Sequence, residues 1–316
     1  MVEVPRLLVT LPPFHDTLEA LAEGHSLKNA FARLSQAYRQ GESSAVLKER
    51  ADYLAYAVAR MPATYAVLET VLAEVAKRWP FKIKTFLDLG SGPGTAYWAA
   101  ECESYRAVER DPSFIALAKE LGVKGEWVQS SLEAYAFNPV DLTLFSYVVA
   151  EIKEYEALVM RAYQETSVLV IVEPGTPAGF ERIRLLRRRL IAQGAHILAP
   201  CPSEGECPMQ EGNWCHFSKR LSRSRLHRSI KGADLGYEDE KYSYVIAAKT
   251  PGNPCKARIL THPHVSKGKV LLPVCLGCEL KTITLKKTKL KWGDALDSLD
   301  SEPEEQDKKS DGKKTC

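Results

Sequence analysis

The sequence predicts an α/β protein in which a helical N-terminal region precedes a parallel sheet and a cysteine-rich, β-containing extension follows it. Three observations predict this fold. Apolar residues recur at helical spacing up to about residue 79, short apolar strands then alternate with helical stretches, and three cysteines gather soon afterwards. We expect four parts, namely a helical region, a sheet domain, a basic cysteine-rich extension and a disordered charged tail, at 1–80, 81–198, 199–292 and 293–316.

Length and composition limit the class of protein. The chain has 316 residues, of which 45% are hydrophobic, so it can bury a sizeable core. No apolar run approaches the roughly 20 residues that span a bilayer, so we expect no membrane partner. Residues 1–16 show neither a signal peptide nor an arginine-rich transit peptide, which favours a cytoplasmic location and reduced cysteines. We also expect a monomer.

The net charge of +3 is unevenly distributed. Residues 181–231 contain eleven Lys or Arg against four Glu, and residues 256–291 contain nine against one. A basic surface of this density is typical of a protein that binds a phosphate backbone. The alternative is a solvated surface without a partner.

The helical region and the sheet are read from two different periodicities. Residues such as Val67, Leu68 and Val71 follow helical spacing, and we expect Pro62 to break or kink its helix. The pattern then changes to alternating strands and helices, which predicts a parallel sheet with ligands bound at the carboxyl ends of its strands. The predicted strands are 85–89, 106–109, 126–129, 142–147 and 168–173, with further strands at 242–248, 269–274 and 281–285.

A glycine-rich turn follows the first predicted strand. Gly90, Gly92 and Gly94 allow a tight turn and close approach of a ligand, and Asp88 precedes them. The dinucleotide-binding pattern would place a third glycine where Thr95 stands. The loop instead resembles the S-adenosylmethionine-binding motif of Rossmann-like methyltransferases.

Glu109 ends the second predicted strand and is placed to accept hydrogen bonds from both ribose hydroxyls of such a cofactor. The alternative for the glycine turn is a role in helix packing alone. No Asn or Asp followed by Pro-Pro and an aromatic residue appears in residues 141–151, so no catalytic residue is identified. Cys201 is the one candidate nucleophile, and its clustering with other cysteines favours a ligand role.

Basic residues surround the cysteines. Arg187 and Arg188 lie on a predicted helix after Glu173, and Arg220 and Arg223 follow the third clustered cysteine. We expect these four arginines to bind RNA. A solvated helix face is the alternative for Arg187 and Arg188.

The spacing of the cysteines indicates a metal site. Five residues separate Cys201 from Cys207 and seven separate Cys207 from Cys215, while Cys275 and Cys278 follow much later. Structural zinc usually takes paired ligands spaced C-x(2–4)-C, whereas an iron–sulfur cluster accepts wider spacing and a distant fourth thiolate. The spacing therefore favours a cluster, with zinc as the alternative.

Taken together, these motifs resemble those of the methyltransferase-like proteins that assist assembly of the small ribosomal subunit, found in mitochondria and with bacterial relatives. The resemblance spans about residues 45–292. It rests on the segments 60–65, 88–95, 173–176 and 200–220.

This resemblance implies a 4Fe-4S cluster held by Cys201, Cys207, Cys215 and Cys275, with Cys278 as the other candidate for the fourth ligand. It also implies contact with small-subunit ribosomal RNA. The function that we expect is an S-adenosylmethionine-dependent, methyltransferase-like protein acting on the small ribosomal subunit. The alternatives are an RNA-binding assembly factor without turnover and a zinc-binding RNA module.

Overall fold

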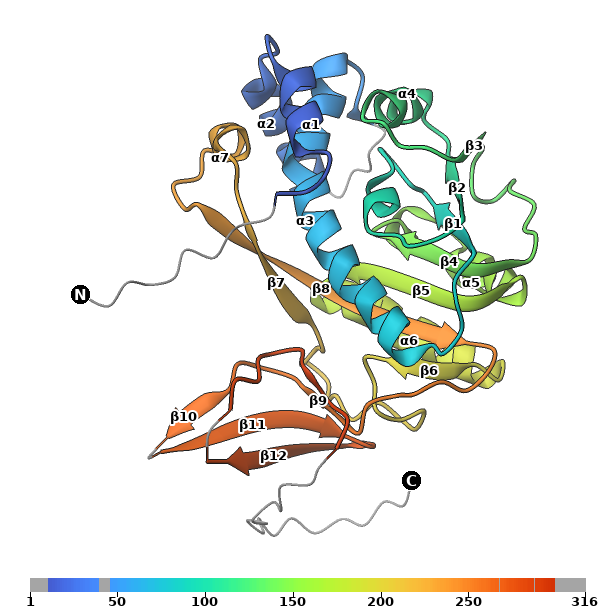
Figure 1. Ribbon diagram of the computed structural model, residues 1–316, viewed down its shortest axis with the longest axis vertical. Helices are drawn as coiled ribbons and strands as arrows, with labels where there is room; N and C mark the ends of the chain where they lie inside the picture. Colours follow the sequence, from blue (N-terminus) through green and yellow to red (C-terminus); the bar gives the residue numbers. More distant parts are fainter. Residues whose placement is uncertain (1–10, 40–45, 267, 287, 299–316) are drawn as a thin grey trace.

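The computed structural model describes residues 11–39, 46–266, 268–286 and 288–298 (Figure 1). Its centre is a mixed sheet with the strand order β3-β2-β1-β4-β5-β8-β6, in which β7 also pairs with β8. The strands are β1 Thr85–Leu89, β2 Ser104–Glu109, β3 Glu126–Gln129, β4 Val140–Ser146, β5 Thr166–Pro174, β6 His196–Ala199, β7 Phe217–Ser222 and β8 Tyr237–Ala248.

Strands β1 to β5 are parallel, whereas β8 runs antiparallel to both β5 and β6. This arrangement confirms the predicted Rossmann-like methyltransferase fold. Each of the first five predicted strands overlaps an observed one. β6 and β7 are not among the predicted strands, and β7 mixes polar with apolar residues. The carboxyl ends of the parallel strands meet at one edge of the sheet, where a ligand is expected.

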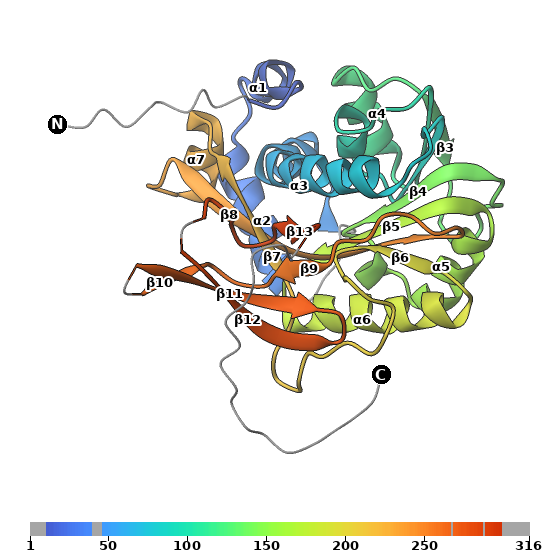
Figure 2. The same cartoon turned by 60° about the horizontal axis from the view of Figure 1, so that its bottom comes forward.

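Helices cover both faces of the sheet (Figure 2). The second half of α3 (Arg50–Arg78) packs on one face, where Val67 and Val71 contact a core that includes Leu144. Helices α5 (Tyr155–Gln164) and α6 (Pro177–Ala192) cover the other face. Burial of these apolar side chains, at about 25 cal/mol per Å², is the main favourable contribution to the fold.

Helix α3 continues through Pro62, so the predicted break is wrong. A proline inside a helix removes one backbone hydrogen bond, here the one to the carbonyl of Val58. The residues on either side, Met61 and Ala63, are almost completely buried. Tertiary packing along the helix therefore outweighs the lost hydrogen bond.

The remaining helices are α1 His15–Ala22, α2 Leu27–Arg39, α4 Pro112–Glu120 and α7 Arg225–Lys231, with short 3-10 turns at Thr95–Trp98 and Val149–Glu151. Helices α1 and α2 pack with the first half of α3 and with α4 around a third core. None of the helices in the described ranges combines the length and the apolar character needed to cross a bilayer.

A second sheet follows the first, with the order β10-β11-β9-β13 and β12 paired to β11. Its strands are β9 Ala257–Ile259, β10 His264–Ser266, β11 Lys269–Leu276, β12 Glu279–Leu285 and β13 Ala295–Leu296. It has its own small core around Leu272 and Val274. β13 falls within the predicted charged tail, 293–316, whose residues from 299 onward lie outside the described ranges.

Candidate functional site: a cofactor cleft and a cysteine cavity

The glycine turn after β1 has a backbone that requires glycine. Gly90 has φ +67°, and a Cβ there would come within 2.4 Å of a Val148 methyl carbon. A Cβ on Gly94, which has φ +73°, would likewise lie 3.1 Å from a Val123 methyl carbon. Gly92 also has positive φ, but nothing lies within 4 Å of its Cβ position. The turn is thus packed at its two ends and open at Gly92, which lines the cleft beside β2 and β4.

Glu109 ties the turn to the end of β2. One of its carboxylate oxygens accepts a hydrogen bond from the Gly92 amide at 2.8 Å, and the other accepts one from the Asp111 amide at 2.9 Å. Each carboxylate oxygen has a second lone pair, so the group can still accept hydrogen bonds from a ligand in the cleft. Glu109 therefore lines the cleft and positions the glycine turn, and its contact with a ribose stays a prediction.

Asp88 lies beneath the turn rather than on its surface. The side chain is 2% exposed and accepts a hydrogen bond of 2.6 Å from the Tyr105 hydroxyl. Burial raises the pKa of Asp88 to about 7, against the effect of that hydrogen bond. Asp88 still borders the part of the cleft next to Ser91.

Three hydroxyl groups around the cleft are buried without a hydrogen-bond partner in the described part of the chain. They belong to Ser91, Ser146 and Tyr147. Tyr147 follows β4 with φ +57°, a conformation that L side chains rarely adopt. Unpaired buried hydroxyls are costly, so the cleft suits a polar ligand that can bond to them. Sequence reasoning missed these residues, and their position at the carboxyl ends of β1 and β4 was the available signal.

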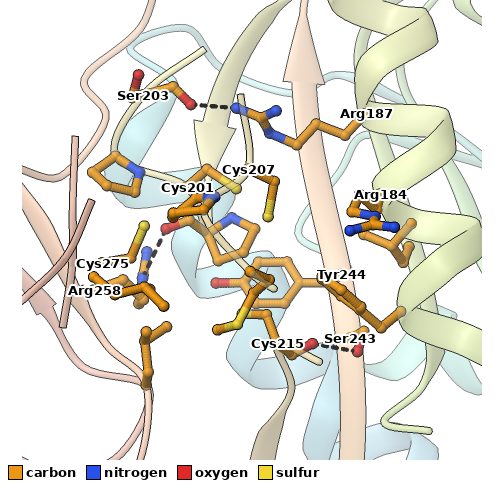
Figure 3. A pocket seen from close by; sticks show the side chains of 18 of the residues that line it. Arg184, Arg187, Cys201, Ser203, Cys207, Cys215, Ser243, Tyr244, Arg258 and Cys275 are labelled. Carbon is orange, nitrogen blue, oxygen red and sulfur yellow. Dashed lines mark hydrogen bonds between the residues drawn. The ribbon is translucent and has the colours of Figure 1, made fainter. Parts of the chain in front are cut away.

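The second site is a cavity lined by Cys201, Cys207, Cys215 and Cys275 (Figure 3). Cys201 follows β6, Cys207 lies in the loop after it, Cys215 precedes β7, and Cys275 lies in β11. The chain therefore brings together three neighbouring cysteines of one segment and a fourth from the second sheet. Much of the remaining wall is apolar and includes Pro200, Pro202, Pro208, Phe217 and Tyr244, while Arg184, Arg187, Arg258 and Glu206 also border the cavity.

Hydrogen bonds hold the cysteine segment against both sheets. The Ser243 hydroxyl on β8 donates to the Cys215 carbonyl at 2.8 Å. Arg258 on β9 donates to the Pro200 carbonyl at 3.1 Å. Arg187 on α6 donates to the carbonyls of Ser203 and Gly205, at 2.6 and 2.9 Å.

Three thiols of this cavity have raised pKa values, which favours their neutral form. Burial raises the pKa of Cys201, of Cys215 and of Cys275, the last to about 12, and the neighbouring thiols add to the shift. Within the described ranges, no three His, Cys, Asp or Glu side chains are grouped closely enough to hold a metal ion. The four thiols therefore surround a space rather than converge on one point.

Cys278, the other candidate for the fourth ligand, does not line the cavity. Its sulfur lies 3.4 Å from the Ser203 hydroxyl oxygen. Cys255 is buried beside the Pro200 carbonyl, at 3.8 Å, and also lies outside the cavity lining.

The four arginines predicted to bind RNA occupy different environments. Arg187 is 7% exposed and faces the cysteine segment, so it does not lie on an RNA-binding surface. Arg220 and Arg223 form ion pairs with Asp239 and Glu238 of β8. Arg188 is exposed. The charge count of the segment missed these pairings, because the acidic partners lie on a later strand that pairs with β7.

Comparisons with known proteins place these features in a family. Residues 50–297 match the model of the family described as Rsm22, mitochondrial small ribosomal subunit Rsm22. The ribosome assembly protein METTL17, mitochondrial, of Homo sapiens is 26% identical, over 72% of this chain and 54% of that protein. Rsm22-cox11 tandem protein 2, mitochondrial, of Schizosaccharomyces pombe is 27% identical, over 62% of this chain and 32% of that protein. The chain thus spans about half the length of the human relative and about a third of the yeast one.

A solved structure with a similar fold is magnesium protoporphyrin IX methyltransferase from Synechocystis with bound SAM. It is 12% identical, covers 60% of this chain and 80% of that one, and has a TM-score of 0.39. Plantazolicin methyltransferase BpumL in complex with SAH is also 12% identical, over 75% of this chain and 99% of that one, with a TM-score of 0.44. At this level of similarity the alignments say nothing of substrate or activity.

The family match corrects the predicted location. The cytoplasm was predicted because residues 1–16 contain no targeting signal, yet the family and both relatives are described as mitochondrial. These descriptions point to mitochondria rather than the cytoplasm. The absence of a targeting signal could not decide the location, because the chain spans only part of its relatives.

Proposed function

Because this chain belongs to the Rsm22 family of mitochondrial small ribosomal subunit proteins, we propose that it acts as a methyltransferase-like assembly factor of the mitochondrial small ribosomal subunit. The family match over residues 50–297 includes both the cofactor cleft and the cysteine cavity. Both sites therefore belong to the part of the chain that the family shares.

S-adenosylmethionine is the cofactor that we propose for the cleft. The carrying observation is the set of unpaired buried hydroxyls of Ser91, Ser146 and Tyr147, which line the same cleft as Glu109 and Gly92. In our proposal Glu109 accepts hydrogen bonds from the ribose, while the open backbone at Gly92 leaves room for the amino acid portion. When bound, the cofactor would supply an activated methyl group.

Binding without turnover is the form of this function that the cleft favours. Tyr147 is a polar side chain directly after β4, where a methyl acceptor would approach. Burial raises the pKa of its hydroxyl well above the ordinary value, so the hydroxyl stays protonated near neutral pH and cannot accept a proton as a general base. The Arg60 guanidinium also lies 5.7 Å from the centre of the Tyr147 ring and forms an ion pair with Glu240. The Arg60 side chain thus occupies this side of the cleft.

A 4Fe-4S cluster is the group that we propose for the cysteine cavity, with Cys201, Cys207, Cys215 and Cys275 as its ligands. Four thiols around one largely apolar cavity form a suitable donor set, since a cuboidal cluster is larger than a single ion. Zinc would need the four sulfurs within about 2.3 Å of one point. When bound, the cluster would cross-link the segment after β6 to the second sheet.

Small-subunit ribosomal RNA is the partner that we propose, and the family match supports this proposal. Of the four arginines predicted to bind RNA, Arg188 is exposed and forms no ion pair within the described part of the chain. Arg220 is exposed despite its pairing with Asp239 and lies 4.1 Å over the Tyr237 ring. Exposed ion pairs are weak, so Arg220 can exchange its carboxylate for a phosphate.

The test measures cofactor binding and methyl transfer separately. Calorimetry of the full chain with S-adenosylmethionine should give binding that Gly92→Arg abolishes, because the arginine side chain would enter the cleft. Labelled cofactor is then incubated with immature small subunits. We expect particle binding without incorporated label. Incorporation that Gly92→Arg removes would establish an enzyme instead, and a wild-type chain that binds no cofactor would overturn the proposed use of the cleft.

A further inference from the structure

Arg187 carries a charge that the described protein does not compensate. Three other arginines of α6 form ion pairs, namely Arg182 with Glu173, Arg184 with Glu181 and Arg189 with Glu156. Arg187 is the most buried of the arginines of α6, at 7% exposure, and no Asp or Glu in the described ranges forms an ion pair with it. Its two hydrogen bonds go to neutral backbone carbonyls, and its Nε is buried without a partner.

A buried guanidinium in this position requires a negative charge nearby. Removing a charged group from water is costly unless an opposite charge and hydrogen bonds replace the lost solvation. Arg258, which lines the same cavity at 2% exposure, satisfies this requirement through its ion pair with Glu74 at 2.8 Å. Arg187 has no such ion pair in the described ranges, because Glu206, which also lines the cavity, is not within ion-pair distance of it. We therefore expect the missing negative charge in the cavity that both arginines border.

The direction of the Arg187 side chain agrees with a negative charge inside the cavity. Figure 3 shows it extending from α6 to the Ser203 carbonyl, with Cys201 and Cys207 beside it. Arg187, Cys201 and Cys207 line the same cavity. The negative charge that Arg187 lacks is thus expected on the sulfur atoms that face it.

We propose that Arg187 is the internal counter-charge of an anionic thiolate-ligated cluster in the cysteine cavity, and that it raises the reduction potential of that cluster. This inference rests on the proposed function. A 4Fe-4S core in its oxidised resting state, bound by four thiolates, has a net charge of about −2, and reduction adds one more negative charge. A nearby positive charge stabilises the reduced form more than the oxidised form, so it makes reduction easier.

Arg187 also has a structural role, and the experiment must separate the two. Its bonds to Ser203 and Gly205 fix the loop that carries Cys207. Arg187→Gln removes the charge and shortens the donor. Arg187→Lys keeps the charge but loses the forked donor. Arg188→Gln removes a neighbouring exposed charge of the same helix and is the matched control.

The full chain and these three variants are purified without oxygen, and iron, acid-labile sulfide and the midpoint potential of the cluster are measured. In the variant Arg187→Gln, the chains that retain a cluster should show a more negative potential. Arg187→Lys should lose iron to a similar extent yet keep a potential close to the wild type, and Arg188→Gln should match the wild type in both. If Arg187→Gln has too little cluster to measure, a wild-type potential in Arg187→Lys supports the proposal, and a potential shifted negative in that variant contradicts it.

Two results would overturn the inference, and they are distinguishable. A wild-type chain with iron and sulfide, together with an unchanged potential in Arg187→Gln, would remove the role of Arg187 and leave the proposed cluster intact. A wild-type chain that contains neither iron nor sulfide would remove both the cluster and its counter-charge.

Discussion

Arg258 and Glu74 form an ion pair of 2.8 Å that joins the second sheet to helix α3. Arg258 also donates to the carbonyls of Pro200 and Gly293, at 3.1 and 2.8 Å. One side chain thus connects α3, the start of the cysteine segment and the turn before β13. The position of Cys275, which pairs directly with Arg258 across β9 and β11, depends on this connection.

Replacing Arg258 by Met should destabilise the protein strongly. It leaves the partly buried carboxylate of Glu74 without its main partner and two carbonyls without their donor. Breaking a buried pair from one side typically costs about 3–5 kcal/mol. Urea unfolding of the wild type and of Arg258→Met measures this loss of stability. Arg220→Met, which breaks the exposed pair with Asp239, is the control and should leave the free energy of unfolding nearly unchanged. Equal losses in the two variants would contradict this role of Arg258.

The two candidates for the fourth ligand should respond differently to replacement. Cys275→Ser should lose iron and soluble protein together, because binding energy at such a site is also folding energy. Cys278→Ser should retain iron, since Cys278 is not among the residues that line the cavity, although its sulfur contacts the lining residue Ser203. Iron and sulfide per chain, measured after anaerobic purification, give the answer. Iron lost from Cys278→Ser but kept in Cys275→Ser would reverse the assignment.

The sheet and the cofactor cleft could be predicted because their signals are local. Apolar runs mark the buried parallel strands, and the glycine turn with Asp88 and Glu109 lies at the ends of the first two. The hydroxyls of Ser146 and Tyr147 gave no comparable signal. Their lack of a partner depends on what surrounds them in three dimensions.

Arg187 and Arg188 show where local reasoning failed and how it could have succeeded. Ile183, Arg187 and Leu190 lie four and three residues apart, so helical spacing places Arg187 on the same buried stripe as the two apolar residues. Arg188 is turned about 100° away and is exposed. The pairing of Arg223 with Glu238 could not be found this way, because it depends on the register of β7 and β8.

The pKa of Asp88 predicts a pH dependence of stability in the cofactor-free protein. The folded value of about 7 exceeds the ordinary 3.8, so the folded state binds more protons between these two pH values. The free energy of unfolding should therefore fall as the pH rises from about 4 to 7, by on the order of 4 kcal/mol at most. Asp88→Asn should flatten this part of the profile, because Asn titrates no proton and still accepts from Tyr105.

Urea unfolding at pH 5 and pH 7.5 measures this change in the free energy of unfolding for the wild type and for Asp88→Asn. Tyr105→Phe is the matched control, since it removes the hydrogen bond that stabilises the charged carboxylate and should steepen the fall with pH. An identical slope in the wild type and in Asp88→Asn would show that Asp88 is not the group responsible.

Arg188 should contribute to RNA binding through its charge alone. Replacing an exposed arginine that contacts one phosphate weakens binding and reduces the slope of log affinity against log salt by about one. Arg188→Gln should show both effects with small-subunit RNA, in binding titrations over a range of salt concentrations, and should leave the iron content unchanged. Arg188→Lys keeps the charge and should keep the slope.

Arg223→Gln should act differently, because Arg223 is 15% exposed and pairs with Glu238. Its loss should lower stability and leave the salt slope as it was. A slope that changes in Arg223→Gln but not in Arg188→Gln would remove Arg188 from the RNA interface.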